Sequence, residues 1–210
     1  KSLHSAYHIP CDEINSLLRD RFNNIWLGSI GGGVLMIDTK QSPFAFYSLN
    51  LAEDDVPTTA VRALFADADK DLWLGTGSYG LARKDYETGV LSFFSHIPEF
   101  SDIPGVPTVN YIIQRKNGEV WFATYDGGIL IYEKGEKVKV LTESDTPYLY
   151  SDCVSALCED SKGNCWVGCR GGLGISLADG EHYNFGALTF AGGGLADWYH
   201  VKDIVEDTDG

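Results

Sequence analysis

The chain has 210 residues, of which 44% are hydrophobic and 22% charged, so it holds enough apolar material for a sizeable core. Its formal net charge of −14 at pH 7 argues against contact with nucleic acid or an anionic membrane surface, because both attract clustered Lys and Arg. No apolar run approaches the roughly 18 residues that a membrane span needs, so we expect no membrane insertion by this region.

Four of the five tryptophans stand in similar surroundings and mark an internal repeat, at spacings of 47, 48 and 45 residues. The surroundings are NNIWLGS at Trp26, KDLWLGT at Trp73, GEVWFAT at Trp121 and GNCWVGC at Trp166. The residues twelve positions before each Trp are Ile14, Val61, Val109 and Val154. Those six positions before it are Asp20, Asp67, Asp160 and, as the exception, Arg115. Those seven positions after it are Gly33, Gly80 and Gly128, with Gly174 one position later in the fourth copy.

Each copy predicts four short strands, as the second copy illustrates. Residues 60–67, 71–76, 81–86 and 90–96 are rich in β-forming residues, and Gly-, Asp- or Thr-containing turns separate them. No segment has a helical period over ten or more residues. A repeat of 40 to 50 residues with four antiparallel strands is typical of a propeller blade, in which we expect each Trp to pack between neighbouring blades.

The predicted fold class is therefore all-β, a β-propeller fragment of four complete blades and single strands of two flanking blades. In chain order, residues 1–10 predict the last strand of a preceding blade. Four blades follow over residues 11–50, 51–98, 99–144 and 145–192, and residues 193–210 predict the first strand and turn of a fifth blade. These parts make one partial propeller domain, whose open blade faces favour self-association, for example as a homodimer.

Four of the five cysteines, Cys153, Cys158, Cys165 and Cys169, lie close together, and Cys11 stands alone. Their spacing does not fit a zinc knuckle, and no His lies among them. We interpret them as small apolar residues of a blade core, with a cross-strand disulfide or a metal as the alternatives. Calcium is a further alternative, since DADKD (residues 67–71) and EDTDG (residues 206–210) are similar to the start of a calcium loop but lack its closing Glu. We predict no metal, cofactor or catalytic residue.

The repeat resembles the regulator-propeller repeats found in the periplasmic sensor region of Bacteroidetes hybrid two-component histidine kinases. The resemblance is carried by INSLLRDRFNNIWLGSIGGGV, VRALFADADKDLWLGTGSYGL and VSALCEDSKGNCWVGCRGGLG. The copy VNYIIQRKNGEVWFATYDGGI is looser, with Arg115 in place of Asp and Ala123 in place of Gly. The resemblance implies a periplasmic location and an oligosaccharide ligand. It also implies control of glycan-utilisation genes, exerted through other domains of the same sensor protein.

Loops that follow the second strand of each copy share one face of a propeller with the loops that enter the next blade. Of these loop residues, Tyr79, Tyr125, Asp126 and Arg170 fit sugar recognition, because aromatic rings stack on sugar C–H faces and charged groups bond hydroxyls. Ile30 and Ser78 occupy the same loops. Weaker candidates at the starts of channel-lining strands are Asn15, Arg62 and Asn110. The alternative is that all of these are ordinary turn residues.

Two other functions stay open. The first is a protein-interaction scaffold, which would bind its partner through the exposed face. The second is a propeller lyase, which would need a His and an acidic residue converging on the channel. The five histidines show no metal-site spacing, and no Ser/His/Asp nucleophile context occurs. We therefore expect this region not to be an enzyme, although the resemblance implies a sensor histidine kinase as its parent protein.

Overall fold

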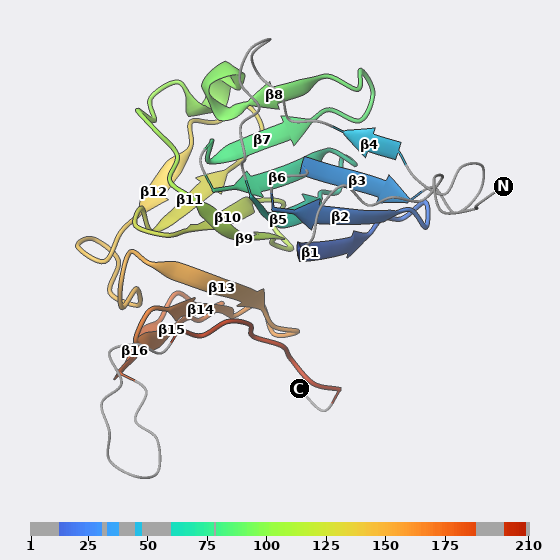
Figure 1. The fold of residues 1–210 in the computed structure, drawn as a ribbon. Coiled ribbons are helices and arrows are strands. Elements are labelled where there is room, and N and C mark those ends of the chain that lie inside the picture. The colour runs from blue at the N-terminus through green and yellow to red at the C-terminus, as the bar shows by residue number, and fades with distance from the viewer. Residues whose placement is uncertain are drawn as a thin grey trace, which may run out of the picture.

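A computed structural model describes residues 13–30, 33–37, 45–47, 60–77, 79–187 and 200–208 (Figure 1). It contains four separate four-stranded antiparallel sheets, in each of which the strands follow sequence order. This confirms the all-β propeller fold class. The first two blades comprise β1 (Ile14–Arg19), β2 (Ile25–Ser29), β3 (Gly33–Ile37), β4 (Ala45–Tyr47), β5 (Val61–Ala66), β6 (Leu72–Thr76), β7 (Leu81–Lys84) and β8 (Leu91–Phe93). The next two comprise β9 (Val109–Gln114), β10 (Val120–Thr124), β11 (Ile129–Tyr132), β12 (Lys139–Leu141), β13 (Val154–Glu159), β14 (Cys165–Cys169), β15 (Gly172–Ser176) and β16 (His182–Ala187).

Neighbouring blades meet through their first strands, β1, β5, β9 and β13, and the fourth strands lie at the periphery (Figure 1). Two short 3₁₀ turns, Phe94–His96 and Pro98–Phe100, connect the second blade to the third. Within the described residues, no helix has the length and apolar character to cross a membrane.

The hydrophobic core lies between blades rather than within them. Trp73 of the second blade is fully buried and packs against the rings of Phe122 and Tyr132 in the third, with centroid separations of 5.1 and 4.9 Å. Trp26 and Trp121 are buried in the corresponding clusters of the first and third interfaces. In the first three blades the Trp is therefore a packing residue that joins one blade to the next, as the repeat predicts, whereas Trp166 of the fourth blade is only half-buried.

A small residue two positions after each Trp lets the next blade approach. A Cβ atom on Gly75 would lie 2.8 Å from the carbonyl oxygen and 2.9 Å from a methyl carbon of Val109, the first residue of β9. A Cβ atom on Gly28 would likewise lie 2.8 Å from a methyl carbon of Val61, the first residue of β5. Ala123 occupies this position in the third blade, where it is fully buried beside Val154. The position thus requires a small side chain, which explains why Ala is tolerated in the looser copy.

The Asp of each repeat is the hydrogen-bond acceptor for the Trp indole. Trp73 donates from Nε1 to Asp67 at 2.8 Å, and the equivalent bonds from Trp26 to Asp20 and from Trp166 to Asp160 measure 2.9 and 3.0 Å. These carboxylates also accept backbone N–H bonds from the adjacent turn. The acidic turns therefore have a structural use that does not involve calcium. Among the residues that the structure describes, no group of three or more His, Cys, Asp or Glu could hold a metal ion.

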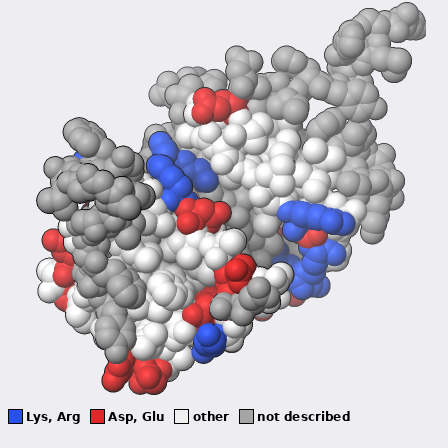
Figure 2. Space-filling model, turned by 90° about the horizontal axis from the view of Figure 1, so that it is seen from below, with Lys and Arg blue, Asp and Glu red and all other residues white. Residues whose placement is uncertain are grey.

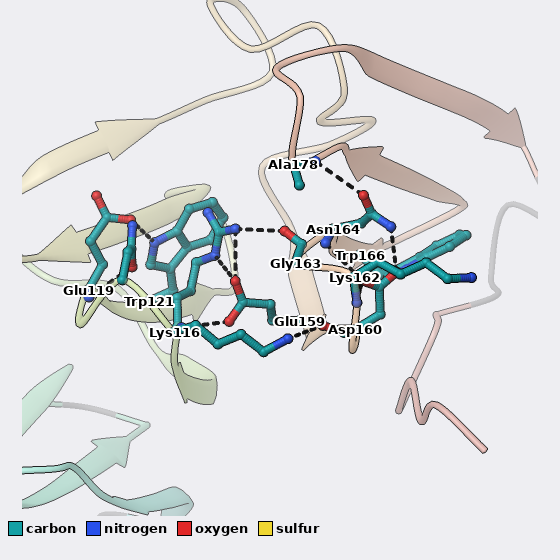
Figure 3. A network of polar contacts seen from close by, with 12 residues as sticks. Lys116, Glu119, Trp121, Glu159, Asp160, Lys162, Gly163, Asn164, Trp166 and Ala178 are labelled. Carbon is teal, nitrogen blue, oxygen red and sulfur yellow. Dashed lines mark hydrogen bonds and ion pairs between the residues drawn. The ribbon is translucent and has the colours of Figure 1, made fainter. Parts of the chain in front are cut away.

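In the third blade a different residue accepts the hydrogen bond from the Trp indole, because Arg115 replaces the Asp. There Trp121 donates to Glu119 at 3.0 Å, and the Arg115 guanidinium lies over the indole ring at 4.8 Å. Arg115 also donates to Glu159 at 3.1 and 3.2 Å and to the carbonyl oxygen of Gly163 at 3.2 Å. Figure 3 shows Glu159 beside Lys116, between the Trp of the third blade and that of the fourth. Arg115, the exception in the repeat, thus connects the third blade to the fourth.

A polar contact between blades recurs at this end of the sheets. The residue that precedes the Asp position accepts a hydrogen bond from a turn N–H of the preceding blade. Ala68 donates to Gln114 at 2.7 Å, Lys116 to Glu159 at 2.6 Å, and Ser161 to Glu206 at 2.7 Å. We call this contact the inter-blade latch. In this contact a side-chain oxygen accepts a hydrogen bond from a backbone N–H of a turn, which would otherwise have to donate to water.

Residues 200–208 lie against the fourth blade where a following blade would begin. Val201 contacts Gly168 as Val109 contacts Gly75, and Glu206 completes the third latch. The segment forms one isolated bridge, between Arg170 and His200, and no strand. The physical reason is that a first strand pairs with the second strand of its own blade. The strand expected over residues 1–10 lies outside the described residues, and the blade boundaries stay a prediction.

Three of the cysteines fill the core, as interpreted from the sequence. Cys153, Cys165 and Cys169 are buried and Cys158 is half-buried, and all four are free thiols. Burial raises the pKa of Cys165 to about 12. Cys11 lies outside the described residues.

Replacing Gly75 by Ala should destabilise the protein by about 1–3 kcal/mol, because the added methyl overlaps Val109 at the blade interface. The free energy of unfolding from urea denaturation measures this cost. Gly105→Ala is the matched control, since a Cβ there would meet no atom within 4 Å. Equal stability of the two variants would show that the close approach of blades is not a constraint.

Replacing Asp67 by Ala should cost about 1–3 kcal/mol of unfolding free energy, because the fully buried Trp73 indole would lose its acceptor. A double-mutant cycle with Trp73→Phe isolates the bond, since Phe fills much of the site without an N–H. Strictly additive effects of the two changes would contradict this assignment.

Alkylation with iodoacetamide at pH 8 should label Cys158 in the folded protein and label Cys165 only after unfolding. The thiolate is the reactive form, and burial keeps the Cys165 thiol protonated. Peptide mass spectrometry measures both rates. Equal labelling of the two, or a disulfide joining them, would disprove the core-filling role.

Candidate functional site

Each of the first strands carries a β-bulge at the same place. In the second blade, Val61 pairs with Thr76 and Ala63 with Gly75, so that Arg62 has no partner in the ladder. The other bulged residues, eleven positions before their Trp, are Asn15, Asn110 and Ser155. A bulge redirects a side chain, and all four of these residues are polar. Lys202 occupies the equivalent position in the segment after the fourth blade.

These five residues line one space, which we call the central hollow. It has a volume of about 1000 Å³ and is bounded by the inner strands β1, β5, β9 and β13 and by residues 200–203. The other side chains with polar groups in its wall are those of Glu13, Ser16, Tyr111, Tyr125, His200 and Asp203. Binding sites for organic ligands are concave and hold a few convergent polar groups, and their volumes run to about 1000 Å³, so the central hollow is the candidate site.

Two of the bulged side chains fasten one blade to the next. Asn110 donates to the carbonyl oxygen of Val154 at 3.1 Å, and Ser155 donates to that of Val201 at 2.7 Å. Within the described part of the chain, the side chains of Asn15, Arg62 and Lys202 make no hydrogen bond or ion pair. Asn110 and Ser155 thus have a structural role, whereas Asn15, Arg62 and Lys202 are available to a ligand.

Two tyrosines border the central hollow, and they differ in exposure and in hydrogen bonding. Tyr125 directly follows β10 and leaves 46% of its surface exposed, and its backbone N–H donates to Thr108 at 2.9 Å. Tyr111 is half-buried and donates its hydroxyl to Asp203 at 3.0 Å. Burial and the neighbouring Asp203 carboxylate raise the pKa of Tyr111 to about 12, so its phenol stays neutral. Tyr125 is therefore the ring that can stack on a ligand, and Tyr111 holds the wall together.

The predicted loop residues divide into two groups. Tyr125 lines the central hollow together with the weaker candidates Asn15, Arg62 and Asn110, and Ile30 joins them. Tyr79 does not, because its ring packs edge-on against Phe93 at 6.1 Å in the core between the first two blades. Ser78 lies outside the described residues.

The other two candidates, Asp126 and Arg170, are exposed near the same end of the hollow. Burial raises the pKa of Cys153, the Asp126 carboxylate raises it further, and the cations Arg170 and Lys202 oppose the rise. Burial also lowers the pKa of His200, and Lys202 and Arg170 lower it further, so this imidazole is neutral at pH 7.

The sequence analysis did not select Ser155, Lys202, Tyr111, His200 or Asp203. A signal for the first two was present, since both stand at the same offset as Arg62 in their copies of the repeat. His200 and Asp203 are the His and acid that a lyase would need near the channel, and the sequence analysis found no such pair there. The pair comes from the segment after the fourth blade, which the sequence predicted to be the first strand and turn of a fifth blade.

A smaller cavity of about 220 Å³ lies at the opposite end of the first two blades. Its stacked rings, Phe22 and Tyr86, are 5.7 Å apart, and Lys70 lies over both of them. Arg21 donates to the carbonyl oxygens of Asp67 and Ala68 from its edge. Since these groups already contact one another across the blade interface, we interpret the cavity as part of that interface.

Comparison with known proteins supports the repeat and the fold. The profile of the family described as two component regulator propeller matches residues 8–31, 55–78 and 151–171. A search of curated proteins finds no match. Similar solved structures include the extracellular domain of a protein described as a one component system of B. thetaiotaomicron. It has 18% identity and a TM-score of 0.64, with 80% of this chain and 22% of that chain covered.

Two further structures have the same fold in other settings. Virginiamycin B lyase from Staphylococcus aureus has 15% identity and a TM-score of 0.63, over 84% of this chain and 56% of that one. The surface component PorZ of the type-IX secretion system of Porphyromonas gingivalis has 20% identity and a TM-score of 0.59. The match covers 93% of this chain and 30% of PorZ. This chain thus spans less than two thirds of each structure, and at these identities the likeness shows the fold alone. Together with the three matched segments, it shows a propeller fold in which residues 8–31, 55–78 and 151–171 are similar to repeats of the two component regulator propeller family.

Proposed function

We propose that this chain is the ligand-sensing propeller of a hybrid two-component signalling protein, located in the periplasm, and that it is not itself an enzyme. Its ligand is an oligosaccharide held in the central hollow, and binding regulates glycan-utilisation genes through other domains of the same protein. The relationship to extracellular domains of two-component systems supports the sensing role.

The observation that carries the proposal is the set of bulged residues that faces one space beside Tyr125. The side chains of Asn15, Arg62 and Lys202 offer amide, guanidinium and ammonium donors, and the Tyr125 ring offers an apolar face. Sugars present the matching surfaces, hydroxyl groups around the edge of the ring and C–H groups on its faces. A hollow of about 1000 Å³ can also take a ligand larger than one sugar.

A propeller lyase is the second candidate, because His200 and Asp203 both line the central hollow and a lyase shares the fold. The Asp203 carboxylate already accepts the Tyr111 hydroxyl, which disfavours a role as catalytic base. Turnover of a bound ligand, measured by mass spectrometry of the ligand after incubation, would favour the lyase over the sensor.

Calorimetric titration of the full-length protein with a panel of glycan oligosaccharides tests the proposal. We expect saturable binding of one class without turnover, and an affinity about tenfold lower or more in Tyr125→Ala and in Arg62→Ala, since both residues would contact the sugar. Tyr86→Ala is the matched control, because Tyr86 is equally exposed, at 47%, but lies at the other end of the blades.

Unchanged affinity in both hollow variants would move the binding site elsewhere and contradict the proposal. Absence of binding to every glycan would also contradict it, and would favour a protein partner bound at the exposed face.

A further inference from the structure

Three cationic side chains lie in or beside the wall of the central hollow, on residues at the first-strand positions of the repeat or directly after a second strand. Arg62 and Lys202 occupy bulge positions and line the hollow. Arg170 directly follows β14 and is bridged to His200, two residues before Lys202. The bridge to His200 places Arg170 beside the segment that carries Lys202.

Four other cations among the described residues form ion pairs. Ion pairs join Arg115 to Glu159, Arg83 to Asp71, Lys134 to Asp69 and Lys137 to Asp102. On the face shown in Figure 2, basic and acidic side chains likewise lie beside one another in small groups. By contrast, the side chains of Arg62, Arg170 and Lys202 form no ion pair or hydrogen bond within the described ranges. Their charge is thus not used to hold the fold together.

The charge balance around these cations differs from that of the whole chain. Among the described residues that line the central hollow, Arg62 and Lys202 are the cations and Glu13 and Asp203 the acids, and Asp203 accepts the Tyr111 hydroxyl. Cations and acids are thus equal in number in this wall, whereas the chain as a whole has 16 basic and 30 acidic residues. A hollow built for neutral sugar alone has no need of exposed guanidinium and ammonium groups in so acidic a protein. Guanidinium groups match the paired oxygens of carboxylate and sulfate.

We propose that the oligosaccharide carries acidic groups, carboxylates or sulfate esters, that pair with the cations Arg62, Arg170 and Lys202. This inference rests on the proposed function, since it assigns the ligand class of the same hollow. The acidic groups bind these cations, and the neutral part of the sugar lies against Tyr125.

The test is calorimetric titration of the full-length protein with paired probes. One pair is an oligogalacturonate and its carboxyl-reduced form, and the other is a heparin-derived oligosaccharide and its desulfated form. We expect one acidic probe to bind, its neutralised counterpart to bind at least tenfold more weakly, and its affinity to fall as salt is raised. The two pairs distinguish carboxylate from sulfate.

Variants locate the acidic groups. Lys202→Glu should lower the affinity for the acidic probe at least tenfold, and Lys202→Arg should keep it within about threefold, because the charge is retained. Lys162→Glu is the matched control, since Lys162 is an exposed lysine in the turn at the opposite end of β13. It changes the net charge equally and should leave binding unchanged.

Neutral forms that bind as tightly as the acidic ones would overturn this inference and leave the proposed function standing. Failure of acidic and neutral probes alike would overturn both. Equal affinity of Lys202→Glu and Lys162→Glu for an acidic probe would overturn the placement of the acidic groups.

Discussion

The contact between a small residue of one blade and the Val that opens the next sets the geometry of this propeller. Gly28, Gly75 and Gly168 each meet such a Val so closely that a Cβ could not fit without a shift of its neighbours. The contact brings the first strands together, so that Trp26, Trp73 and Trp121 are buried between two sheets. Because the sheets bury their apolar faces on one another, no blade could be stable alone.

The same contact explains why the two ends of the strands have different roles. At one end, the indole acceptors and the inter-blade latch use polar groups to fasten blades, as Glu159 does with Arg115 and Lys116. At the other end, a bulge directly after the contacting Val redirects one side chain per blade into the central hollow. Asn110 and Ser155 stabilise the packing there, whereas Arg62 and Lys202 remain exposed. A fixed scaffold thus carries a variable set of side chains, one from each repeat.

The sequence predicted the strands and the blade packing because both follow from residue type and spacing within one repeat. It also placed Asn15, Arg62 and Asn110 at the channel, since their offset from Trp is constant. The bulge was not predicted, because it depends on the pairing register between two strands. The latch and the role of Arg115 were missed because both join residues of different blades. The packing of Tyr79 against Phe93, outside the central hollow, was not predicted either, because it depends on the tertiary structure.

The central claim is that the blade contact and the bulge together build a ligand site at one end of the first strands. Hydrogen–deuterium exchange of the full-length protein, with and without a saturating oligosaccharide, tests it most directly. The account predicts slower exchange at residues 60–63, 108–111, 153–156 and 200–203, and unchanged exchange in the turns at 67–71, 115–119 and 160–164. Protection confined to those turns, or spread equally over both ends of the strands, would contradict it.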